Sequence, residues 1–235
     1  MLVTDGMEGA SDVDLFLVRH GDALGVDGAG NATPDGALSL LGERQARLVG
    51  ARLAGAGVTR ILSSPLVRAL ATASHIAEAC RHRSVEVWPE LREGYSETHH
   101  GYGRADLAAR FPLSVLPAGV AGDGWDHGGD TPVSLTGRAA RIATLLAARC
   151  APDDRAIVVS HGGIVNYLLH VLLGVPSSAP VWFEMDNGAI TALRLVPEPE
   201  RRDWPLYPPV AVELLTLNDV AHLAEAARLP KSSRQ

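Results

Sequence analysis

The chain has 235 residues, of which 46% are hydrophobic and 20% charged, and this suits one domain of generous size or a core domain with an insertion. Lys and Arg number 21 against 27 Asp and Glu, giving a formal charge of −6, and no basic run could neutralise a nucleic-acid backbone. We therefore expect no nucleic-acid partner. An anion could be bound only by a few Arg and His side chains gathered in a pocket, because the overall field would repel it.

The ends of the chain and its cysteines indicate a cytoplasmic protein. Residues 1–12 contain no apolar core for a signal peptide, and no later run approaches the roughly 18 apolar residues of a membrane span. We expect no membrane partner, a disordered tail over 1–12 and a second tail over 224–235. Cys80 and Cys150 do not indicate a disulfide framework. The abundance of Ala is typical of a bacterium with a GC-rich genome.

The first part of the chain predicts strands that alternate with helices. In order, these are a strand over 13–18, a helix capped by Ser39 and continuing to about Gly55, a strand at 61–62, a helix opened by Pro65 and continuing to about Arg81, and a strand over 85–88.

The pattern breaks down from 94 to about 131, where Gly, His, Asp and Pro interrupt one short helix candidate near 104–111. We interpret this segment as an inserted lid. The remaining predicted elements are a helix opened by Thr131-Pro132 and ending at Cys150, a strand over 156–159, a helix over 164–173, and strands over 189–196 and 211–217.

This order predicts an α/β fold in which residues 13–223 form a single domain. The architecture is three layers, α/β/α, with a mostly parallel central sheet and the inserted lid. Ligands of such sheets bind outside the carboxyl ends of the strands. Arg19-His20, the Ser63-Ser64-Pro65 turn leading to Arg68, and His161 all follow predicted strands, so we expect them to meet in one pocket.

These side chains suit phosphoryl transfer. The planar fork of Arg19 or of Arg68 can donate two parallel hydrogen bonds to phosphate. A neutral imidazole such as His20 can attack phosphorus and form a phosphohistidine, and nearby positive charge keeps its attacking nitrogen unprotonated. His161 would donate a hydrogen bond to the phosphoryl oxygens.

The leaving group needs a proton, which calls for a carboxyl group. Glu93 is our candidate because it follows the strand over 85–88, and Glu90 and Glu97 are neighbouring carboxylates that the sequence leaves open.

Several segments resemble one family. Leu17-Val18-Arg19-His20-Gly21-Asp22-Ala23 resembles the signature of the histidine phosphatases, the superfamily that includes the cofactor-dependent phosphoglycerate mutases. The resemblance extends over roughly 13–223 through five further stretches, 38–46, 63–73, 158–163, 187–191 and 217–219. It implies that His20 is the nucleophile, that Arg19, Arg68, His161 and Gly162 bind phosphate, and that Glu93 is the proton donor.

The departures from the family pattern bear on the reaction. Asp22-Ala23 follows the signature where many members have Glu-Thr or Glu-Ser, Val26 lies near an expected Asn, and the loop over 26–31 lacks the aromatic-rich segment of the mutases. We therefore predict a phosphatase that hydrolyses small phosphomonoesters through a phosphohistidine on His20, with a small phosphorylated metabolite as its partner. The alternatives are phosphotransfer of the phosphoglycerate mutase type and a non-catalytic protein that binds a phospholigand.

The lid contains residues with further chemistry. His99-His100 and the run over 123–130 have no standard metal-ligand spacing, so we predict no metal and no cofactor. Tyr95, His99, His100 and Tyr102 are candidates to contact the organic part of a substrate. The sequence leaves the oligomeric state open, a homodimer included.

Overall fold

The computed structural model describes residues 12–26, 30, 33–82, 84–197 and 209–224. The two predicted tails lie outside the described residues except for Asp12 and Ala224, as does most of the loop over 26–31. None of the described helices is both long and apolar enough to cross a membrane.

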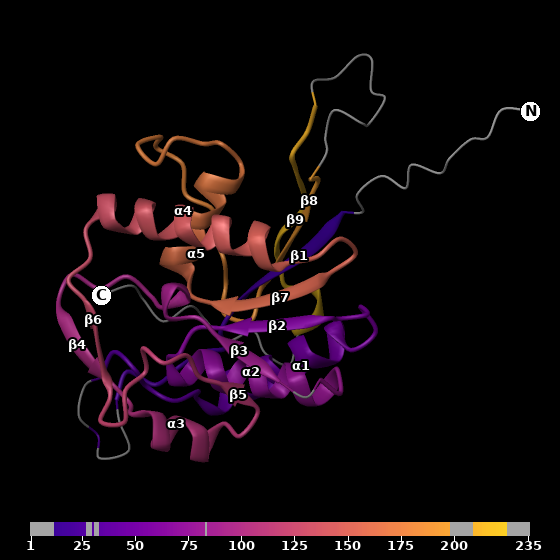
Figure 1. The fold of residues 1–235 in the computed structure, drawn as a ribbon. Coiled ribbons are helices and arrows are strands. Elements are labelled where there is room, and N and C mark those ends of the chain that lie inside the picture. The colour runs from indigo at the N-terminus through magenta and orange to yellow at the C-terminus, as the bar shows by residue number, and fades with distance from the viewer. Residues whose placement is uncertain (1–11, 27–29, 31–32, 83, 198–208, 225–235) are drawn as a thin grey trace, which may run out of the picture.

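The predicted helices and strands are present in the predicted order, and β4, β5 and β6 are additional strands within the segment over 94–131 (Figure 1). They are β1 (Val13–Arg19), α1 (Leu40–Leu53), β2 (Arg60–Ser63), α2 (Val67–Ala79), β3 (Val85–Val87), the 3-10 helix η1 (Pro89–Leu91), β4 (Thr98–Gly101), α3 (Arg104–Arg110), β5 (Ser114–Val115), β6 (Trp125–Gly128), α4 (Pro132–Arg149), β7 (Arg155–Ser160), α5 (Gly162–Leu172), β8 (Ile190–Leu195), β9 (Val212–Asp219) and the 3-10 helix η3 (Ala221–Leu223).

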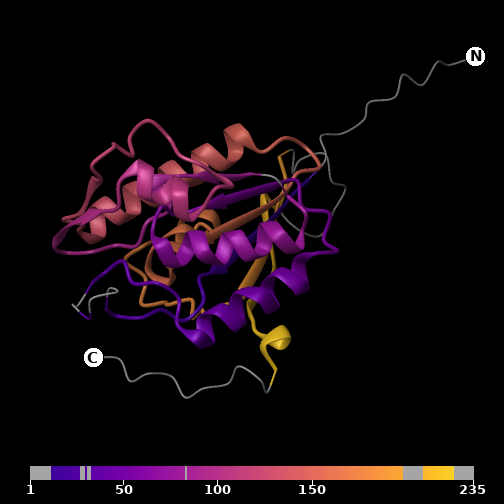
Figure 2. The same ribbon diagram turned by 90° about the horizontal axis from the view of Figure 1, so that it is seen from below.

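The central sheet has seven strands in the order β5-β3-β2-β7-β1-β8-β9. The first five are parallel to one another, and β8 is antiparallel to both β1 and β9. Helices α4 and α5 cover one face and α1 and α2 the other, and Figure 2 shows α1 and α2 lying along their face of the sheet. The predicted three-layer α/β/α fold with a mostly parallel sheet is confirmed.

The two faces of the sheet form two cores, because side chains alternate along a strand. In β1, Leu15 and Leu17 pack with residues of α4 and α5, whereas Val18 packs with residues of α1 and α2. Both leucines are fully buried, and each contributes about 1.5–3 kcal/mol to the free energy of unfolding. Burial on both faces explains why β1 and β7 read as almost continuous apolar runs.

The segment over 94–131 contains more structure than its sequence predicts. It includes the expected short helix, α3, and also β4 and β6, which pair antiparallel in a separate two-stranded sheet. Its β5 pairs with β3 and so extends the central sheet at one edge. The segments Thr98–Gly101 and Trp125–Gly128 show no strand-like alternation, and for this reason the sequence analysis missed them.

Two predicted helix starts differ from the structure. Helix α2 begins at Val67 rather than at Pro65, because Ser63-Ser64-Pro65 is used in a turn in which Ser64 Oγ accepts a hydrogen bond from the Leu66 N–H. Helix α5 begins at Gly162 rather than at residue 164, directly after the strand that precedes it.

The predicted cap of α4 is present and offers a test of stability. Thr131 Oγ1 accepts the Ser134 N–H at 3.2 Å, and Ser134 Oγ accepts the Thr131 N–H at 2.9 Å. We expect Thr131→Ala to lower the free energy of unfolding by about 1 kcal/mol, measured by urea denaturation. Thr144→Ala in the same helix is the control, because its hydroxyl donates to the Ala140 carbonyl one turn earlier and does not cap the helix. Equal losses in the two variants would contradict the capping role.

Candidate active site

The polar residues that follow β1, β2 and β7 lie side by side at one edge of the sheet. Arg19 pairs in register with Ser160, and Ser63 with Val159. His20 and His161 therefore leave neighbouring parallel strands at the same level, and their ring centroids are 4.9 Å apart. The convergence that the sequence predicts is confirmed for these two histidines.

His20 is held in one tautomer by two partners with opposite hydrogen-bonding capacity. Its Nδ1 lies 2.7 Å from the Gly21 carbonyl oxygen, which can only accept a hydrogen bond. Its Nε2 lies 3.0 Å from Nε of Arg68, which can only donate one. The ring therefore carries its proton on Nδ1, and the lone pair of Nε2 faces the Arg68 guanidinium.

The surroundings keep both imidazoles neutral. His20 is 7% exposed and His161 is fully buried. Burial, followed by the charge of Arg68, holds the pKa of each ring well below the usual value for His, and Arg19 contributes in the same direction. The hydrogen bond to Gly21 opposes the shift at His20 but does not reverse it.

Arg68 is fixed by contacts from three parts of the chain. Besides its contact with His20, it donates from Nη1 to the Pro34 carbonyl at 2.7 Å and from Nη2 to the Tyr95 hydroxyl at 2.9 Å. That hydroxyl in turn donates to the same Pro34 carbonyl at 2.8 Å. Tyr95, which the sequence analysis assigned to the lid, therefore reaches the arginine fork directly.

Asp35 is a residue of this site that the sequence analysis missed. Its Oδ1 accepts the Val67 N–H at 2.7 Å and lies 3.9 Å from Nη1 of Arg68. It thus supplies the side-chain cap that Leu66 cannot give to helix α2. Burial raises the pKa of Asp35 to about 6, although the Val67 N–H and the charge of Arg68 oppose the shift.

Arg19, which precedes His20 in the chain, is anchored by its guanidinium. It donates from Nη1 to the Met185 carbonyl at 2.6 Å, and among the described residues its buried Nε has no hydrogen-bond partner. Burial lowers the pKa of its guanidinium, and the charge of Glu93 is the largest effect that opposes this shift. A Cβ at Gly162 would lie 3.5 Å from Arg19 Nε, so the start of α5 packs against this arginine.

His161 lies between β7 and α5, where its Nε2 is 2.8 Å from Ser64 Oγ. Within the described part of the chain, its buried Nδ1 has no hydrogen-bond partner. Because Ser64 belongs to the turn after β2, this contact joins two of the strand ends that form the site.

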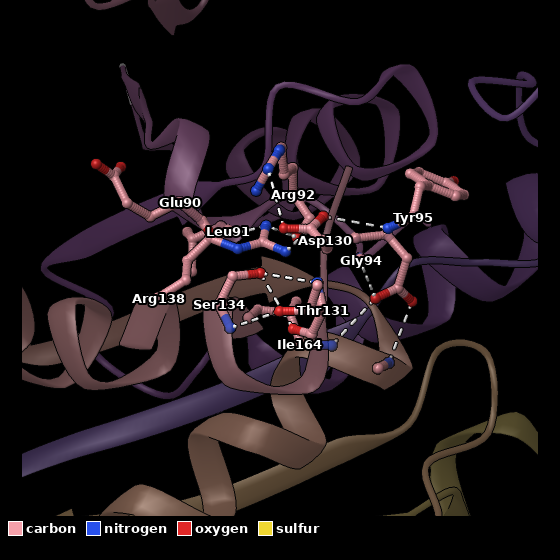
Figure 3. Close-up of polar contacts among 12 residues, drawn as sticks. Glu90, Leu91, Arg92, Gly94, Tyr95, Asp130, Thr131, Ser134, Arg138 and Ile164 are labelled. Atoms are coloured by element: carbon pink, nitrogen blue, oxygen red, sulfur yellow. Dashed lines mark hydrogen bonds and ion pairs between the residues drawn. The ribbon is translucent and has the colours of Figure 1, made fainter. Parts of the chain in front are cut away.

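Glu93 lies at the first turn of α5. Its two carboxylate oxygens accept the N–H groups of Gly163, at 3.1 Å, and Ile164, at 3.0 Å, and Oε1 also accepts the Gly94 N–H at 2.9 Å (Figure 3). The approach is so close that a Cβ at Gly163 would lie 2.6 Å from Glu93 Oε1. Glu93 therefore lies next to the segment that carries His161.

The other candidate carboxylates lie elsewhere. Figure 3 shows the side chain of Glu90 directed away from the hydrogen bonds around Glu93. Glu97 lies in the lid, where its carbonyl accepts the Gly129 N–H. Of the three glutamates that the sequence left open, the structure brings Glu93 to the start of α5.

The remaining lid candidates divide into two groups. His99 packs edge-on against Tyr95 with ring centroids 5.0 Å apart. Because the Tyr95 hydroxyl bonds Arg68, these two residues lie close to the site. His100 is instead exposed and bonded to Asp126 at 2.8 Å, and Tyr102 packs against Arg110. The described residues contain no group of three or more His, Cys, Asp or Glu side chains that could hold a metal ion.

His127 is a second residue that the sequence analysis did not single out. It is 3% exposed and stacks on Trp125 with ring centroids 4.5 Å apart. Burial, followed by the charges of Arg92 and His99, lowers its pKa to about 4. Neither ring nitrogen has a hydrogen-bond partner among the residues that the structure describes.

The geometry defines a class of protein: an α/β fold with a buried site of two arginines and two neutral imidazoles at the carboxyl ends of parallel strands. The family model of the histidine phosphatase superfamily, branch 1, matches residues 15–203. The chain belongs to this superfamily.

Related sequences carry the name of one enzyme. A protein of Proteus mirabilis named probable phosphoglycerate mutase GpmB is 31% identical over 220 residues, which cover 92% of this chain and 97% of the relative. The protein of Erwinia tasmaniensis with the same name is 32% identical over 222 residues, again covering 92% and 97%.

Similar solved structures carry the names of phosphatases. A mycobacterial glucosyl-3-phosphoglycerate phosphatase in complex with VO3 is 26% identical with a TM-score of 0.56, and the match covers 87% of this chain and 98% of that one. A phosphoserine phosphatase mutant of Entamoeba histolytica, in complex with phosphoserine, is 23% identical with a TM-score of 0.60, covering 90% and 99%. At this identity the latter likeness shows the fold alone.

The lowered pKa of His20 predicts its behaviour in an NMR titration. We expect the ring to keep its neutral, Nδ1-protonated form well below the pH at which an exposed imidazole titrates, because protonation would place a charge in a buried site beside Arg68. Long-range ¹H–¹⁵N correlation spectra measure this, and His20→Gln assigns the signal. His100 is an internal contrast, because its hydrogen bond to Asp126 raises its pKa. A His20 ring that titrates near pH 6.5 would contradict the assignment.

The raised pKa of Asp35 predicts a pH-dependent stability. The folded protein holds this proton up to about pH 6 and the unfolded chain only to about pH 4, so the charge of Asp35 destabilises the fold as pH rises through this window. Asp35→Asn keeps an acceptor for the Val67 N–H but does not titrate. We expect the free energy of unfolding of the variant to gain about 1 to 3 kcal/mol relative to wild type between pH 4 and pH 6.5. Urea denaturation at several pH values measures this difference, and a constant difference would argue against the buried carboxyl.

Proposed function

We propose that the chain is a metal-independent phosphatase that hydrolyses small phosphomonoesters in two steps, through a phosphohistidine on His20. The observation that carries the proposal is the tautomer of His20. Its Nδ1 is protonated and bonded to Gly21, so its Nε2 is a neutral nucleophile directly beside a guanidinium that can bind the phosphoryl oxygens.

In the first step, Nε2 of His20 attacks phosphorus, the N–P bond forms and the bond to the leaving oxygen breaks. Arg68 turns its Nε–H from Nε2 to a phosphoryl oxygen as the substrate enters. Arg19 and His161 offer further donors, since one nitrogen of each has no partner among the described residues. Gly162 offers the N–H at the start of α5, where the helix dipole favours an anion.

Glu93 is the general acid and general base in this proposal. It gives a proton to the leaving oxygen in the first step and takes one from water in the second, when water attacks phosphorus and the N–P bond breaks. Inorganic phosphate then leaves, and His20 and Glu93 return to their starting states. The support for Glu93 is its place at the first turn of α5, next to His161.

Hydrolysis is favoured over the alternatives by the name of the similar structure that is 26% identical and by the sequence of the loop over 26–31. The solved structure that is 26% identical is a phosphatase that acts on a glucosyl-phosphoglycerate. Val26 and Ala29 are examples of small or aliphatic residues in a loop where the mutases have aromatic side chains. By this analogy, the substrate is a small phosphorylated metabolite.

A second candidate is transfer of phosphate within one substrate. The relatives of 31% and 32% identity that are named probable phosphoglycerate mutases favour it. It differs from hydrolysis in two measurable properties, because a mutase needs a bisphosphorylated primer and keeps a stable phosphoenzyme.

The test is release of inorganic phosphate from a panel of phosphomonoesters in the presence of EDTA. We expect wild type to hydrolyse some of them and His20→Ala to lose about 10³-fold or more of kcat, because no other group forms the covalent intermediate. His82→Ala is the control, since the ring of that histidine contacts Ser84 and the Thr59 carbonyl and lies near the start of β2. Activity only with a bisphosphoglycerate primer would favour the mutase, and phosphate binding without turnover would favour a binding protein.

A further inference from the structure

We propose that Arg92, Asp130 and Arg138 form a clamp that positions Glu93 for proton transfer. The three are positioning residues, and the inference rests on the role of Glu93 proposed above. Arg92 precedes Glu93 in the chain, Asp130 ends the lid and Arg138 lies in α4, so the clamp joins three segments (Figure 3).

The centre of the clamp is the carboxylate of Asp130, which is 6% exposed. Its Oδ1 accepts a hydrogen bond from Arg92 Nη2 at 3.2 Å, and its Oδ2 forms an ion pair with Arg138 Nη2, also at 3.2 Å. Oδ2 also accepts the Tyr95 N–H at 3.2 Å, and the Asp130 N–H donates to the Tyr95 carbonyl at 2.8 Å. Tyr95 is therefore held by its backbone, two residues after Glu93.

The other side of Glu93 is held by Arg138. Its Nη1 donates to the Arg92 carbonyl at 2.7 Å and lies 3.4 Å from the Glu90 carbonyl. Arg138 thus bonds the main chain at Arg92, immediately before Glu93. It also pairs with the Asp130 carboxylate, which bonds the main chain at Tyr95, after Glu93. The main chain at Glu93 is restrained on both sides by a single buried network.

Stability alone is a poor explanation for this network. Two arginines and one carboxylate lose their hydration when buried, and apolar side chains of similar volume often stabilise a fold equally well or better. The cost of removing a charge from water is visible at Arg138, because burial lowers the pKa of its guanidinium to about 10. Directional bonds to main-chain atoms give something that apolar packing does not, namely a fixed position for the chain that carries Glu93.

The same network also reaches the phosphate side of the site. The Tyr95 hydroxyl accepts from Arg68 Nη2, and Arg68 contacts His20. Fixing Tyr95 therefore sets the arginine fork and Glu93 relative to each other. A displacement of about 1 Å between reacting groups can cost on the order of 10²-fold in rate.

A misplaced acid affects leaving groups unequally, and this gives the test. An alkoxide needs a proton as it leaves, whereas p-nitrophenolate needs little help. We expect Asp130→Asn to lower the rate of phosphoenzyme formation from an alkyl phosphate about 10- to 100-fold more than from p-nitrophenyl phosphate, with KM little changed. Rapid-quench measurements follow both reactions, with the alkyl phosphate that wild type hydrolyses fastest.

Two further variants make the test decisive. Glu93→Gln sets the largest change in the alkyl-to-aryl ratio that loss of the acid can cause. Arg92→Gln removes one partner of Asp130, and Arg92 is less buried than Asp130. This variant replaces Asp130→Asn if Asp130→Asn does not fold. We expect Arg92→Gln to lower the alkyl-to-aryl ratio as well.

Arg60→Met is the matched control. Arg60 also donates to a main-chain carbonyl, that of Arg149, and pairs with a carboxylate, that of Glu86, but it lies at the first residue of β2, at the opposite end of this strand from Ser63. We expect this variant to lose stability and to keep the wild-type ratio.

The outcomes separate the inference from the proposed function. If wild type forms no phosphohistidine, the proposed function fails. If wild type forms it and Glu93→Gln lowers the ratio, but the folded clamp variants keep it, the clamp is overturned while the function stands. If Glu93→Gln keeps the wild-type ratio, Glu93 is not the acid and the clamp inference falls with that role.

Discussion

The hydrogen bond from Arg68 Nε to His20 Nε2 is the interaction on which the site depends. It exists only if the imidazole has its proton on Nδ1, and the Gly21 carbonyl ensures this. It also needs the end of β1 and the start of α2 to lie together, although 48 residues separate His20 from Arg68 in the sequence. The parallel pairing of β2 and β1 with β7 provides that placement.

Three carboxylates with similar contacts lie beside the arginines of the site and of the clamp. Asp35 accepts the Val67 N–H beside Arg68. Glu93 accepts the first N–H groups of α5, and its charge opposes the lowering of the Arg19 pKa by burial. Asp130 accepts the Tyr95 N–H and lies between Arg92 and Arg138. Each carboxylate thus fixes a main-chain segment and neutralises part of the local charge.

The sequence predicted the parts of the site that follow from strand ends. His20 and His161 converge because each follows a buried apolar run, and such runs lie side by side in a parallel sheet. The Thr131 cap was predictable because its partner, Ser134, is only three residues away in the sequence. Local pattern is sufficient where the partner is close in sequence or where the topology is regular.

The contacts that the sequence did not predict join irregular segments. Asp35 lies in a Gly-rich loop and bonds a helix 32 residues later, and no periodicity marks such a pair. The sequence analysis named Glu93 as its candidate, but it did not predict that the Glu93 carboxylate accepts the first N–H groups of α5, because that contact depends on tertiary packing. The strands β4 and β6 pair only because the lid turns back on itself, and neither has an apolar alternation of its own.

The division between strand ends and loops also explains why relatives of one fold carry the names of two kinds of enzyme. In the function proposed above, the groups that meet at the strand ends act on the phosphoryl group, which is the same in every phosphomonoester. In that proposal, hydrolysis and transfer differ in what reaches the phosphohistidine second, water or an organic hydroxyl, and we expect the segments that follow the strands to determine which of the two does so. In this chain those segments include Tyr95, His99 and the neutral, buried His127. A neutral imidazole offers one donor and one acceptor, so such a lid can select by hydrogen bonding without adding charge to a site that already holds two arginines.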